Sequence, residues 1–288
     1  MEKYSCKRII RMMRALFCVF IIFAAFSAQG QNDVKFPEPV PMKPEMTEFW
    51  EPQPDVVDPG VRPSDQPCST PSDAIILFDG RDLSEWQGAS NKKALIPGKD
   101  TAMFISSEEG EAKWHIENGN MVVNKKAGDI QTKRVFGDFQ LHIEWRIPED
   151  ISGEGQRRGN SGVFLQGVYE LQVLDSYENI TYVNGQAASI YKQTPPLVNA
   201  MSKPGEWNIY DIIYTAPTFR ENGTYRTKPM VTVLHNGILV HYNTVIAGTT
   251  PYRGLPKVIP HGKGPIRLQA HGDPSEPISF RNIWIREL

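Results

Sequence analysis

Residues 160–177, NSGVFLQGVYELQVLDSY, contain two stretches in which apolar and polar side chains alternate. Successive side chains of a β-strand point to opposite faces. Tyr169, Leu171 and Val173 should therefore face a core, while Glu170 and Gln172 share the opposite face. The stretch predicts two neighbouring strands with one polar face. Asp175 continues the core-facing series, so it reaches the polar face only if the strand bulges or ends before it.

Similar short alternating segments follow one another from Asp73 to the C-terminus, and almost nothing resembles a long helix. Two Asn-Gly pairs, Asn118-Gly119 and Asn236-Gly237, are flanked by such segments and predict tight hairpins. About eleven strands with frequent turns predict an all-β fold, a sandwich or jelly roll, with a closed barrel as the less favoured alternative. The predicted strands are 74–78, 114–117, 120–123, 139–147, 162–165, 169–175, 208–215, 230–234, 238–242, 265–270 and 278–287.

The first thirty residues have the pattern of a secretory signal peptide. A basic segment precedes an apolar run from Ala15 to Phe26, and small residues follow, ending at Ala28-Gln29-Gly30. An uncleaved transmembrane anchor is the alternative, but the apolar run is shorter than the ~20 residues that a span needs. We therefore expect a mature chain that begins near Gln31, is exported to the periplasm or the medium, and has no stable membrane insertion. The basic residues are Lys3, Lys7, Arg8, Arg11 and Arg14.

Residues 31–72 contain ten prolines and few apolar clusters. Proline lacks the backbone donor that helices and sheets need, so this stretch should form an extended arm. It could be a free tether or a strap that wraps the folded part. Phe49 and Trp50 favour the strap, because two aromatic side chains would be unfavourable in water on a free linker. One folded domain is then expected over residues 73–288.

Cysteine content and charge exclude some classes of protein. Cys6 and Cys18 lie in the predicted signal peptide, so the mature chain keeps only Cys68 and cannot form an internal disulfide. Cleavage removes five of the 31 basic and one of the 33 acidic residues, which leaves a net charge of −6. Such a chain shows no basic surface typical of nucleic-acid binding.

Further polar faces accompany the one on residues 169–173. In residues 139–147 alternate residues are apolar, and His142, Glu144 and Arg146 lie on the opposite face; in 265–271 the outward residues are Arg267, Gln269 and His271. If these faces adjoin on one concave sheet, they form a groove of acids, amides, a guanidinium and an imidazole. Such groups bind vicinal sugar hydroxyls, and Tyr177 or Trp207 could contact a sugar ring. The alternative is an ordinary solvated sheet face.

Compact metal and cofactor motifs are absent from the sequence. His115, His142, His241 and His261 occur without HExxH or any similar ligand spacing, so neither a transition metal nor another cofactor is predicted. Calcium held by carbonyl and Asp oxygens would leave no such pattern. The GxSxG nucleophile elbow and the GxGxxG nucleotide loop are also missing from the sequence.

A series of short motifs runs through about residues 74–288: Leu77-Phe78-Asp79-Gly80 with Leu83 and Trp86, Phe136-Gly137-Asp138-Phe139, Gly159-Asn160-Ser161-Gly162, Tyr169-Glu170-Leu171-Gln172-Val173, Lys203-Pro204-Gly205-Glu206-Trp207, Asn236-Gly237, Gly264-Pro265-Ile266, Leu268-Gln269 and Phe280-Arg281-Asn282-Ile283-Trp284. In content and order these motifs resemble the bacterial 3-keto-disaccharide hydrolase domain. The resemblance implies a concanavalin A-like jelly roll of two curved antiparallel sheets, export, and cleavage of glycosides oxidised to a ketone at C3.

One motif departs from the family pattern. Many relatives read Leu-Gln-Asp-His-Gly where this chain has Leu268-Gln269-Ala270-His271-Gly272. The acid is lost while the Gln and the His are kept, so an Asp at position 270 cannot be essential here. The resemblance then favours His271 and Glu170 as catalytic residues.

The resemblance implies an oxidised saccharide as substrate, and the chemistry of such a sugar then favours elimination across C1 and C2 followed by addition of water. A ketone at C3 acidifies the proton on C2, so a base, an acid and donors for the enolate oxygen are needed. His271 or Glu170 could be the base, and Asp175 or Tyr177 the acid. Arg146, Gln172 and Gln269 could be the donors, and the other expected substrate-binding residues are Glu144, Asn160, Tyr177 and Trp207.

Two other functions remain open from the sequence. The first is direct hydrolysis by a carboxylate pair, Glu170 and Asp175, as in simple glycosidases. The second is a non-catalytic carbohydrate-binding module, because the same fold also serves binding alone.

Overall fold

The computed structural model of the chain describes residues 41–59, 67–89, 93–95, 102–104 and 110–288. The predicted signal peptide, together with 31–40 and 60–66 of the predicted arm, lies outside the described residues. Within the described ranges, no helix has the length and apolar character needed to cross a membrane. The elements are η1 (Pro44–Thr47), β1 (Asp55–Val56), β2 (Ile75–Phe78), β3 (Trp86–Gly88), β4 (Lys93–Leu95), β5 (Ala102–Phe104), β6 (His115–Glu117), β7 (Asn120–Val122), β8 (Ile130–Thr132), β9 (Phe139–Arg146), η2 (Gly155–Arg157), β10 (Ser161–Leu165), β11 (Tyr169–Val173), η3 (Val183–Gly185), β12 (Val198–Asn199), β13 (Trp207–Thr215), β14 (Thr218–Phe219), β15 (Tyr225–Thr227), β16 (Met230–His235), β17 (Ile238–Val245), β18 (Arg267–Leu268) and β19 (Ser279–Glu287).

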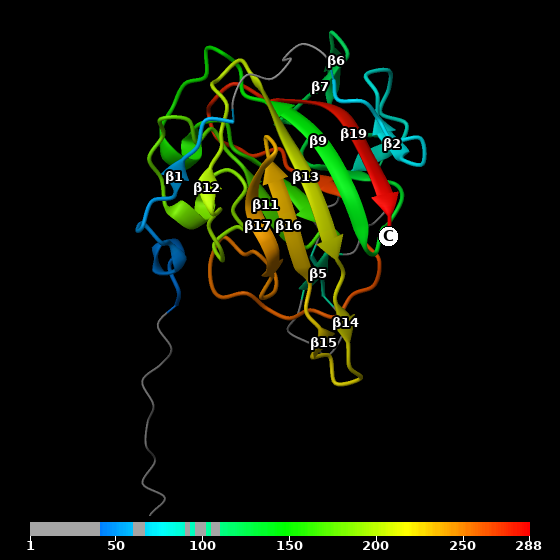
Figure 1. The fold of residues 1–288 in the computed structure, drawn as a ribbon. Coiled ribbons are helices and arrows are strands. Elements are labelled where there is room, and N and C mark those ends of the chain that lie inside the picture. The colour runs from blue at the N-terminus through cyan, green and yellow to red at the C-terminus, as the bar shows by residue number, and fades with distance from the viewer. Residues whose placement is uncertain (1–40, 60–66, 90–92, 96–101, 105–109) are drawn as a thin grey trace, which may run out of the picture. The chain divides into compact units, whose positions relative to one another are not determined.

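Two antiparallel sheets form the fold (Figure 1). The eight-stranded sheet has the order β17-β16-β13-β9-β19-β7-β6, with β2 also paired to β19. The five-stranded sheet has the order β11-β10-β18-β8-β3. Three small two-stranded pairs, β1–β12, β4–β5 and β14–β15, complete the described strands. The prediction of an all-β sandwich of two antiparallel sheets is confirmed.

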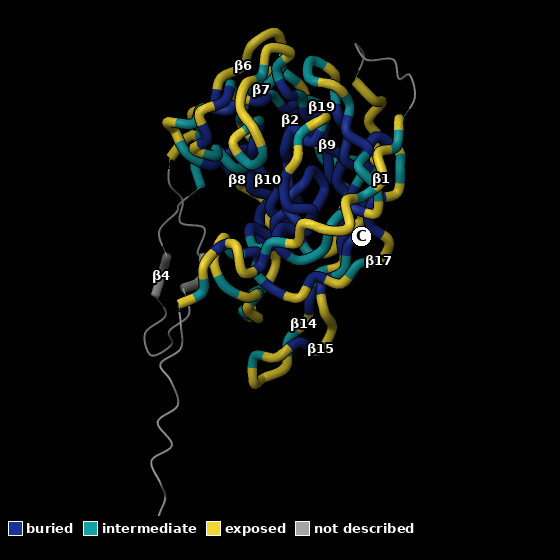
Figure 2. The backbone as a smooth tube through the Cα atoms, turned by 90° about the vertical axis from the view of Figure 1, so that its left-hand side faces the viewer, coloured by how far each residue is buried: buried dark blue, intermediate teal, exposed yellow. Residues whose placement is uncertain are grey.

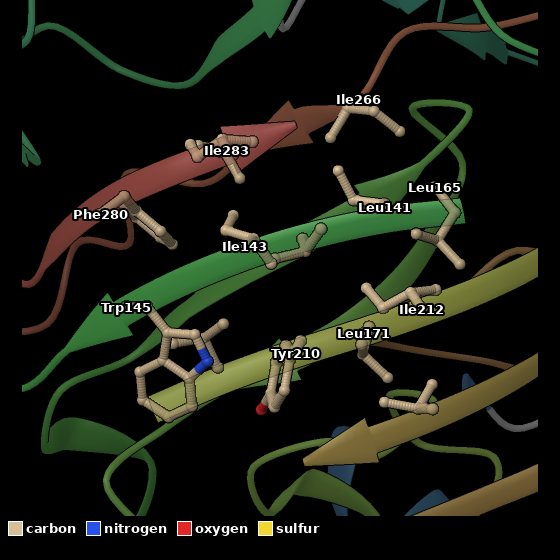
Figure 3. Close-up of a cluster of buried hydrophobic side chains, with 14 of the residues drawn as sticks. Leu141, Ile143, Trp145, Leu165, Leu171, Tyr210, Ile212, Ile266, Phe280 and Ile283 are labelled. Carbon is tan, nitrogen blue, oxygen red and sulfur yellow. The ribbon is translucent and has the colours of Figure 1, made fainter. Parts of the chain in front are cut away.

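The hydrophobic core lies between the two sheets (Figures 2 and 3). Leu141, Ile143 and Trp145 from β9 are completely buried, and they face Leu165 of β10 and Leu171 of β11. Each such side chain contributes roughly 1.5–3 kcal/mol of transfer free energy on burial. The predicted alternation of core and outer residues along β9 and β11 is therefore confirmed.

Both predicted Asn-Gly hairpins are present. Asn118 and Gly119 have φ values of 51° and 74° between β6 and β7, and Asn236 and Gly237 have 54° and 76° between β16 and β17. Positive φ at both central residues is the requirement of a type I′ turn, which asparagine and glycine meet at low cost.

The described part of the predicted arm lies against the domain as a strap, and the compact unit begins at Met42. The Phe49 amide donates to Asn184 Oδ1 at 3.0 Å, and the Val183 amide donates to the Phe49 carbonyl at 2.6 Å. Strand β1 pairs in parallel with β12. Phe49 and Trp50 themselves stay half exposed. Main-chain hydrogen bonds therefore hold the strap, and burial of these two aromatic rings contributes less than the sequence suggested.

Two strands of the five-stranded sheet, β3 and β8, were not predicted. Each is three residues long, which is too short for an alternating pattern to be recognised. Strand β11 ends at Val173 and β18 covers only Arg267 and Leu268, so both are shorter than predicted.

Candidate functional site

A cavity of about 550 Å³ opens on the outer face of the five-stranded sheet. Strands β10, β11 and β18 form its floor, because their alternate residues face the core and the remaining ones face the cavity. The segment between β17 and β18 forms the opposite wall. This volume lies within the roughly 300–1,000 Å³ of small-molecule sites. The lining residues are Asn160, Phe164, Val168, Glu170, Gln172, Tyr191, Thr249, Thr250, Pro251, Tyr252, Arg253, Leu255, Lys257, Ile259, Arg267, Gln269 and His271.

Glu170 is the acidic residue among those lining residues. The Glu170 amide donates a hydrogen bond to the hydroxyl of Thr250 at 3.1 Å. Its carboxylate folds against the adjacent strand, where a Cβ on Gly162 would lie 2.5 Å from Glu170 Oε1. The Glu170 carboxylate can therefore occupy this position only because residue 162 has no side chain. Burial raises the pKa of Glu170 to about 8, against the opposing attraction of Arg267.

Arg267 of β18 supplies a buried positive charge to the floor of the cavity. Its guanidinium carbon lies 3.9 Å from the centroid of the Phe164 ring, and Nε lies 3.8 Å from Asp129 Oδ2. Asp129 also accepts a hydrogen bond from the Ala270 amide at 2.8 Å, which joins the segment after β18 to the residue before β8. A cation in this position can stabilise a negative charge that develops on a bound substrate.

Three amide side chains complete the floor. Gln172 donates from Nε2 to Asn160 Oδ1 at 3.1 Å, and Asn160 in turn donates to the Gln156 carbonyl at 2.9 Å. Gln172 Oε1 and Gln269 Oε1 are buried and accept no hydrogen bond from the residues that the structure describes. Buried acceptors without partners are rare in folded proteins. Both oxygens are therefore suited to accept hydrogen bonds from the hydroxyls of a sugar.

His271 lies at the edge of the cavity, and Asp273 fixes its ring. Nδ1 lies 3.0 Å from Asp273 Oδ2 and 3.2 Å from the Asp273 amide nitrogen. Nδ1 thus has an acceptor when it carries a proton and a donor when it does not, which suits a proton-transfer group. Burial acts to raise the pKa of Asp273, but hydrogen bonds from His271, Ser275 and Lys125 hold it below its usual value. Asp273 is thus the carboxylate partner of His271, while position 270 of this chain is Ala.

The strap and the cavity wall meet at Lys192, which is almost completely buried. Lys192 Nζ donates to the Pro44 carbonyl at 2.9 Å, to Glu48 Oε1 at 3.3 Å and to the Tyr252 carbonyl at 3.1 Å. It also lies over the rings of Tyr191 and Tyr252, at 5.9 and 4.9 Å. Because both tyrosines line the cavity, one ammonium group joins the strap to two parts of the site.

Glu144, Arg146 and Trp207 do not belong to this site, which corrects the prediction. They lie on β9 and β13, on the outer face of the eight-stranded sheet, where Arg146 and Arg281 stack on the Trp207 ring at 4.7 and 4.0 Å. The alternation predicted the correct face of each strand. It carries no information on which of the two sheets a strand joins, so polar faces of different sheets were combined.

Glu144 is the centre of a filled hydrogen-bond network. Oε1 accepts from the Cys68 amide at 2.8 Å and from Asn282 Nδ2 at 2.7 Å, and Oε2 accepts from Arg281 Nε at 2.6 Å. Burial opposes ionisation, but hydrogen bonds, first from His142 and then from Asn282, the Cys68 amide and Arg281, lower the pKa of Glu144 to about 2. The network attaches the segment around Cys68 to the sheet.

One group of residues could hold a metal ion by distance alone. One ligand atom each of Cys68, His142 and Glu144 lie within 4.8 Å of one another. His142, however, has Asp211 Oδ1 2.6 Å from Nδ1, and the oxygens of Glu144 already accept three hydrogen bonds from charged or amide donors. A metal would have to displace these bonds, so the arrangement fits an ion-pair network better than a metal centre.

Asp175 and Tyr177 also lie outside the residues that line the cavity, which corrects two further predictions. Asp175 follows the end of β11 with a fully buried side chain, and Arg158 Nε donates to its Oδ2 at 2.7 Å. Its Oδ1 accepts from the Tyr177 amide at 3.1 Å. These contacts stabilise the loop after β11, so both residues have a structural role there.

Of the predicted site residues, the cavity brings together five: Asn160, Glu170, Gln172, Gln269 and His271. Sequence reasoning did not select Asp129, Asp273 or the residues of 249–259. Asp129 precedes a strand too short to be recognised, and residues 249–259 form no regular element. The spacing of two residues between His271 and Asp273 was the one sequence signal that could have identified Asp273 as a partner of His271.

Comparison with known proteins places the chain in a family. The family model for the 3-keto-alpha-glucoside-1,2-lyase-like domain matches residues 73–286. A crystal structure from Parabacteroides distasonis, described as a "putative glycosyl hydrolase", has 59% sequence identity and a TM-score of 0.70, and the match covers 85% of this chain and 96% of that one. A second structure from the same organism, with the same description, has 18% identity and a TM-score of 0.50 over 75% of this chain and 94% of that one.

A search of curated proteins finds no match. The second crystal structure, at 18% identity, supports the fold alone. The family model covers more than half of the chain and agrees with the resemblance seen in the sequence motifs. The chain therefore belongs to the 3-keto-alpha-glucoside-1,2-lyase-like family and is a carbohydrate-active enzyme.

Proposed function

We propose that the enzyme cleaves glycosides whose sugar carries a ketone at C3, by elimination across C1 and C2 followed by addition of water. The observation that carries this proposal is Glu170. A buried carboxyl group with a pKa of about 8 is suited to accept a proton from carbon near neutral pH, because a general base works best near the pH of its environment. Its neighbours in the cavity are groups that bind hydroxyls and offset negative charge.

In the first step, the carboxylate of Glu170 removes the proton from C2. The electron pair of the C2–H bond forms the C1=C2 double bond, the C1–O1 bond breaks, and the ketone at C3 stabilises the enolate that develops. Arg267 is the cation in the cavity floor that would stabilise this charge, while Gln172 Oε1 and Gln269 Oε1 would accept hydrogen bonds from the sugar hydroxyls. His271 gives the departing O1 its proton from Nε2, while Asp273 holds Nδ1.

In the second step, water adds to C1 of the enone and Glu170 returns its proton to C2. His271, now lacking a proton on Nε2, accepts the proton that the water loses. The sum of the two steps is hydrolysis of the glycoside, and both residues return to their starting states. Neither step needs an added oxidant or reductant.

The cavity favours this reaction over the two alternatives. A two-carboxylate hydrolase needs a second acid at about 5–9.5 Å from the first. Asp175, the expected partner, has a fully buried side chain paired with Arg158, and Glu170 is the acid among the described lining residues. A pure binding module would need no carboxyl group with so strongly raised a pKa, since such groups gather at catalytic sites.

The test is cleavage in deuterated water. The full chain is incubated with a 3-keto-glucoside and, in parallel, with the unoxidised glucoside, in both anomers. We expect cleavage of the keto sugar with deuterium incorporated at C2, and no cleavage of the plain glucoside. Cleavage of the plain glucoside, or of the keto sugar without label at C2, would refute the elimination. Binding of both sugars without turnover would support the binding module.

A further inference from the structure

The mouth of the cavity carries two positive charges without acidic partners. Arg253 and Lys257 are exposed lining residues, and neither forms an ion pair with any residue in the described ranges. The remaining lining charges, Arg267 and Glu170, lie together in the floor beside Asp129. The chain as a whole has a formal net charge of −2. The mouth is thus a local positive region on an acidic protein.

The loop that carries these charges is fixed at its base. The Thr249 amide donates to the Lys257 carbonyl at 3.0 Å, and the Lys257 amide donates to Thr249 Oγ1 at 3.1 Å. Gly248 permits this close pairing, because a Cβ there would lie 2.6 Å from the Lys257 carbonyl oxygen. Gln193 Nε2 donates to the carbonyls of Gly248 and Thr249. Arg253 and Lys257 are therefore held over the cavity by an ordered loop.

Apolar side chains lie on the same loop. Tyr252 and Leu255 are 60% and 62% exposed, and both line the cavity with Ile259. The polar floor around Glu170 and the two glutamines suits a sugar ring, whereas this wall suits an apolar or aromatic group beside a negative charge. Charges lining a cleft attract an oppositely charged ligand and raise its local concentration.

We propose that the loop 249–259 binds the leaving group of the substrate and selects one that carries an anionic group, such as a carboxylate or a sulfate, on an apolar body. The inference rests on the proposed function, because that function places the sugar on the floor and so the leaving group at the mouth. Arg253 and Lys257 would bind the anion, and Tyr252 and Leu255 its carrier.

The test compares two substrates that differ in one charge. The 3-keto-glucosides of 4-hydroxybenzoate and 4-hydroxybenzamide are assayed at about 50 mM and about 500 mM NaCl, since salt screens exposed charges. We expect kcat/KM to favour the benzoate by about 10-fold at low salt, and the preference to shrink at high salt. In the double variant Arg253→Gln, Lys257→Gln the ratio should fall to about 1.

A matched double variant, Arg226→Gln with Lys228→Gln, removes the same charge from exposed positions that do not line the cavity, and should keep the preference. An equal rate for both substrates in the wild type, or an unchanged ratio in the Arg253/Lys257 variant, would overturn the inference while leaving the elimination intact. If neither substrate is cleaved, the proposed function fails. Calorimetric titration with the unoxidised benzoate and benzamide glucosides then tests the inference. The Kd of the benzoate should be about 10-fold lower than that of the benzamide, and equal Kd values would overturn the inference.

Discussion

Two buried glutamates, one on each sheet, show opposite uses of similar groups. Glu144 and Glu170 are both almost inaccessible to solvent and both lie near an arginine. The carboxylate of Glu144 accepts hydrogen bonds on both oxygens, and its pKa is about 2. That of Glu170 accepts none from the residues that the structure describes, and its pKa is about 8. The two glutamates share burial and a neighbouring arginine, and they differ in whether their carboxylate oxygens accept hydrogen bonds.

This difference separates a structural group from a reactive one. Every oxygen of Glu144 is already used to hold the sheet and the segment at Cys68 together, so no capacity remains for a ligand. The carboxylate of Glu170 can still accept hydrogen bonds from a ligand because it faces a cavity. It occupies the space that the missing side chain of Gly162 leaves free. Buried polar groups without partners are costly, so their presence beside a cavity indicates a function.

Replacing Glu170 by Gln should have the largest effect, on turnover. The isosteric amide fills the same space but cannot accept the C2 proton, so kcat should fall by about 10³-fold or more, a change of ~4 kcal/mol. The wild-type rate should rise with pH towards the pKa of Glu170, and the residual rate of the variant should not. Steady-state assays of the 3-keto-glucoside over this pH range measure both. A variant with more than a tenth of wild-type activity would contradict the assignment.

The ionisation of Glu170 should also appear in the pH dependence of the free energy of unfolding. The pKa of Glu170 rises from the model-peptide value of 4.5 to about 8 on folding. Between these values the unfolded chain is ionised while the folded one keeps its proton. The stabilising contribution is therefore complete below pH 4.5 and is lost as the pH rises through about 8, by about 5 kcal/mol at ~1.4 kcal/mol for each pKa unit.

Denaturant unfolding of the wild type and of Glu170→Gln at about pH 5 and about pH 9 isolates this contribution. The variant should gain stability relative to the wild type as the pH rises. Parallel pH curves for the two proteins would show that Glu170 titrates normally.

Replacing Glu144 by Ala should leave the activity of the folded protein unchanged and reduce its stability. The change leaves Arg281, which is mostly buried, and His142 without their shared carboxylate. Removing one partner of such a pair costs about 3 kcal/mol, at the low end of the range because Arg281 also stacks on Trp207. The midpoint of denaturant unfolding measures the stability, and kcat under native conditions measures the activity. Equal losses of kcat for the Glu144 and Glu170 variants would remove the distinction between the two sheets.

The sequence predicted the faces of the strands correctly and their assembly only in part. Alternation along β11 placed Glu170 and Gln172 opposite the core, and they line the cavity as expected. Alternation along β9 was equally correct for Glu144, yet that strand belongs to the other sheet. A period of two residues reports a face, whereas the pairing of distant strands depends on long-range packing. The contributions of Asp129, Asp273 and residues 249–259 come from short or irregular segments that carry no periodic signal.

The contacts of Lys192 also set an order of events in the synthesis of the chain. Pro44 is separated from Lys192 by 148 residues, and the Tyr252 carbonyl lies a further 60 residues along the chain. Residues 44–48 leave the ribosome early, yet their contact with the cavity wall requires that Lys192 and Tyr252 have been made. The wall of the cavity is therefore completed only after most of the chain exists, although the strap is among its first parts to be synthesised.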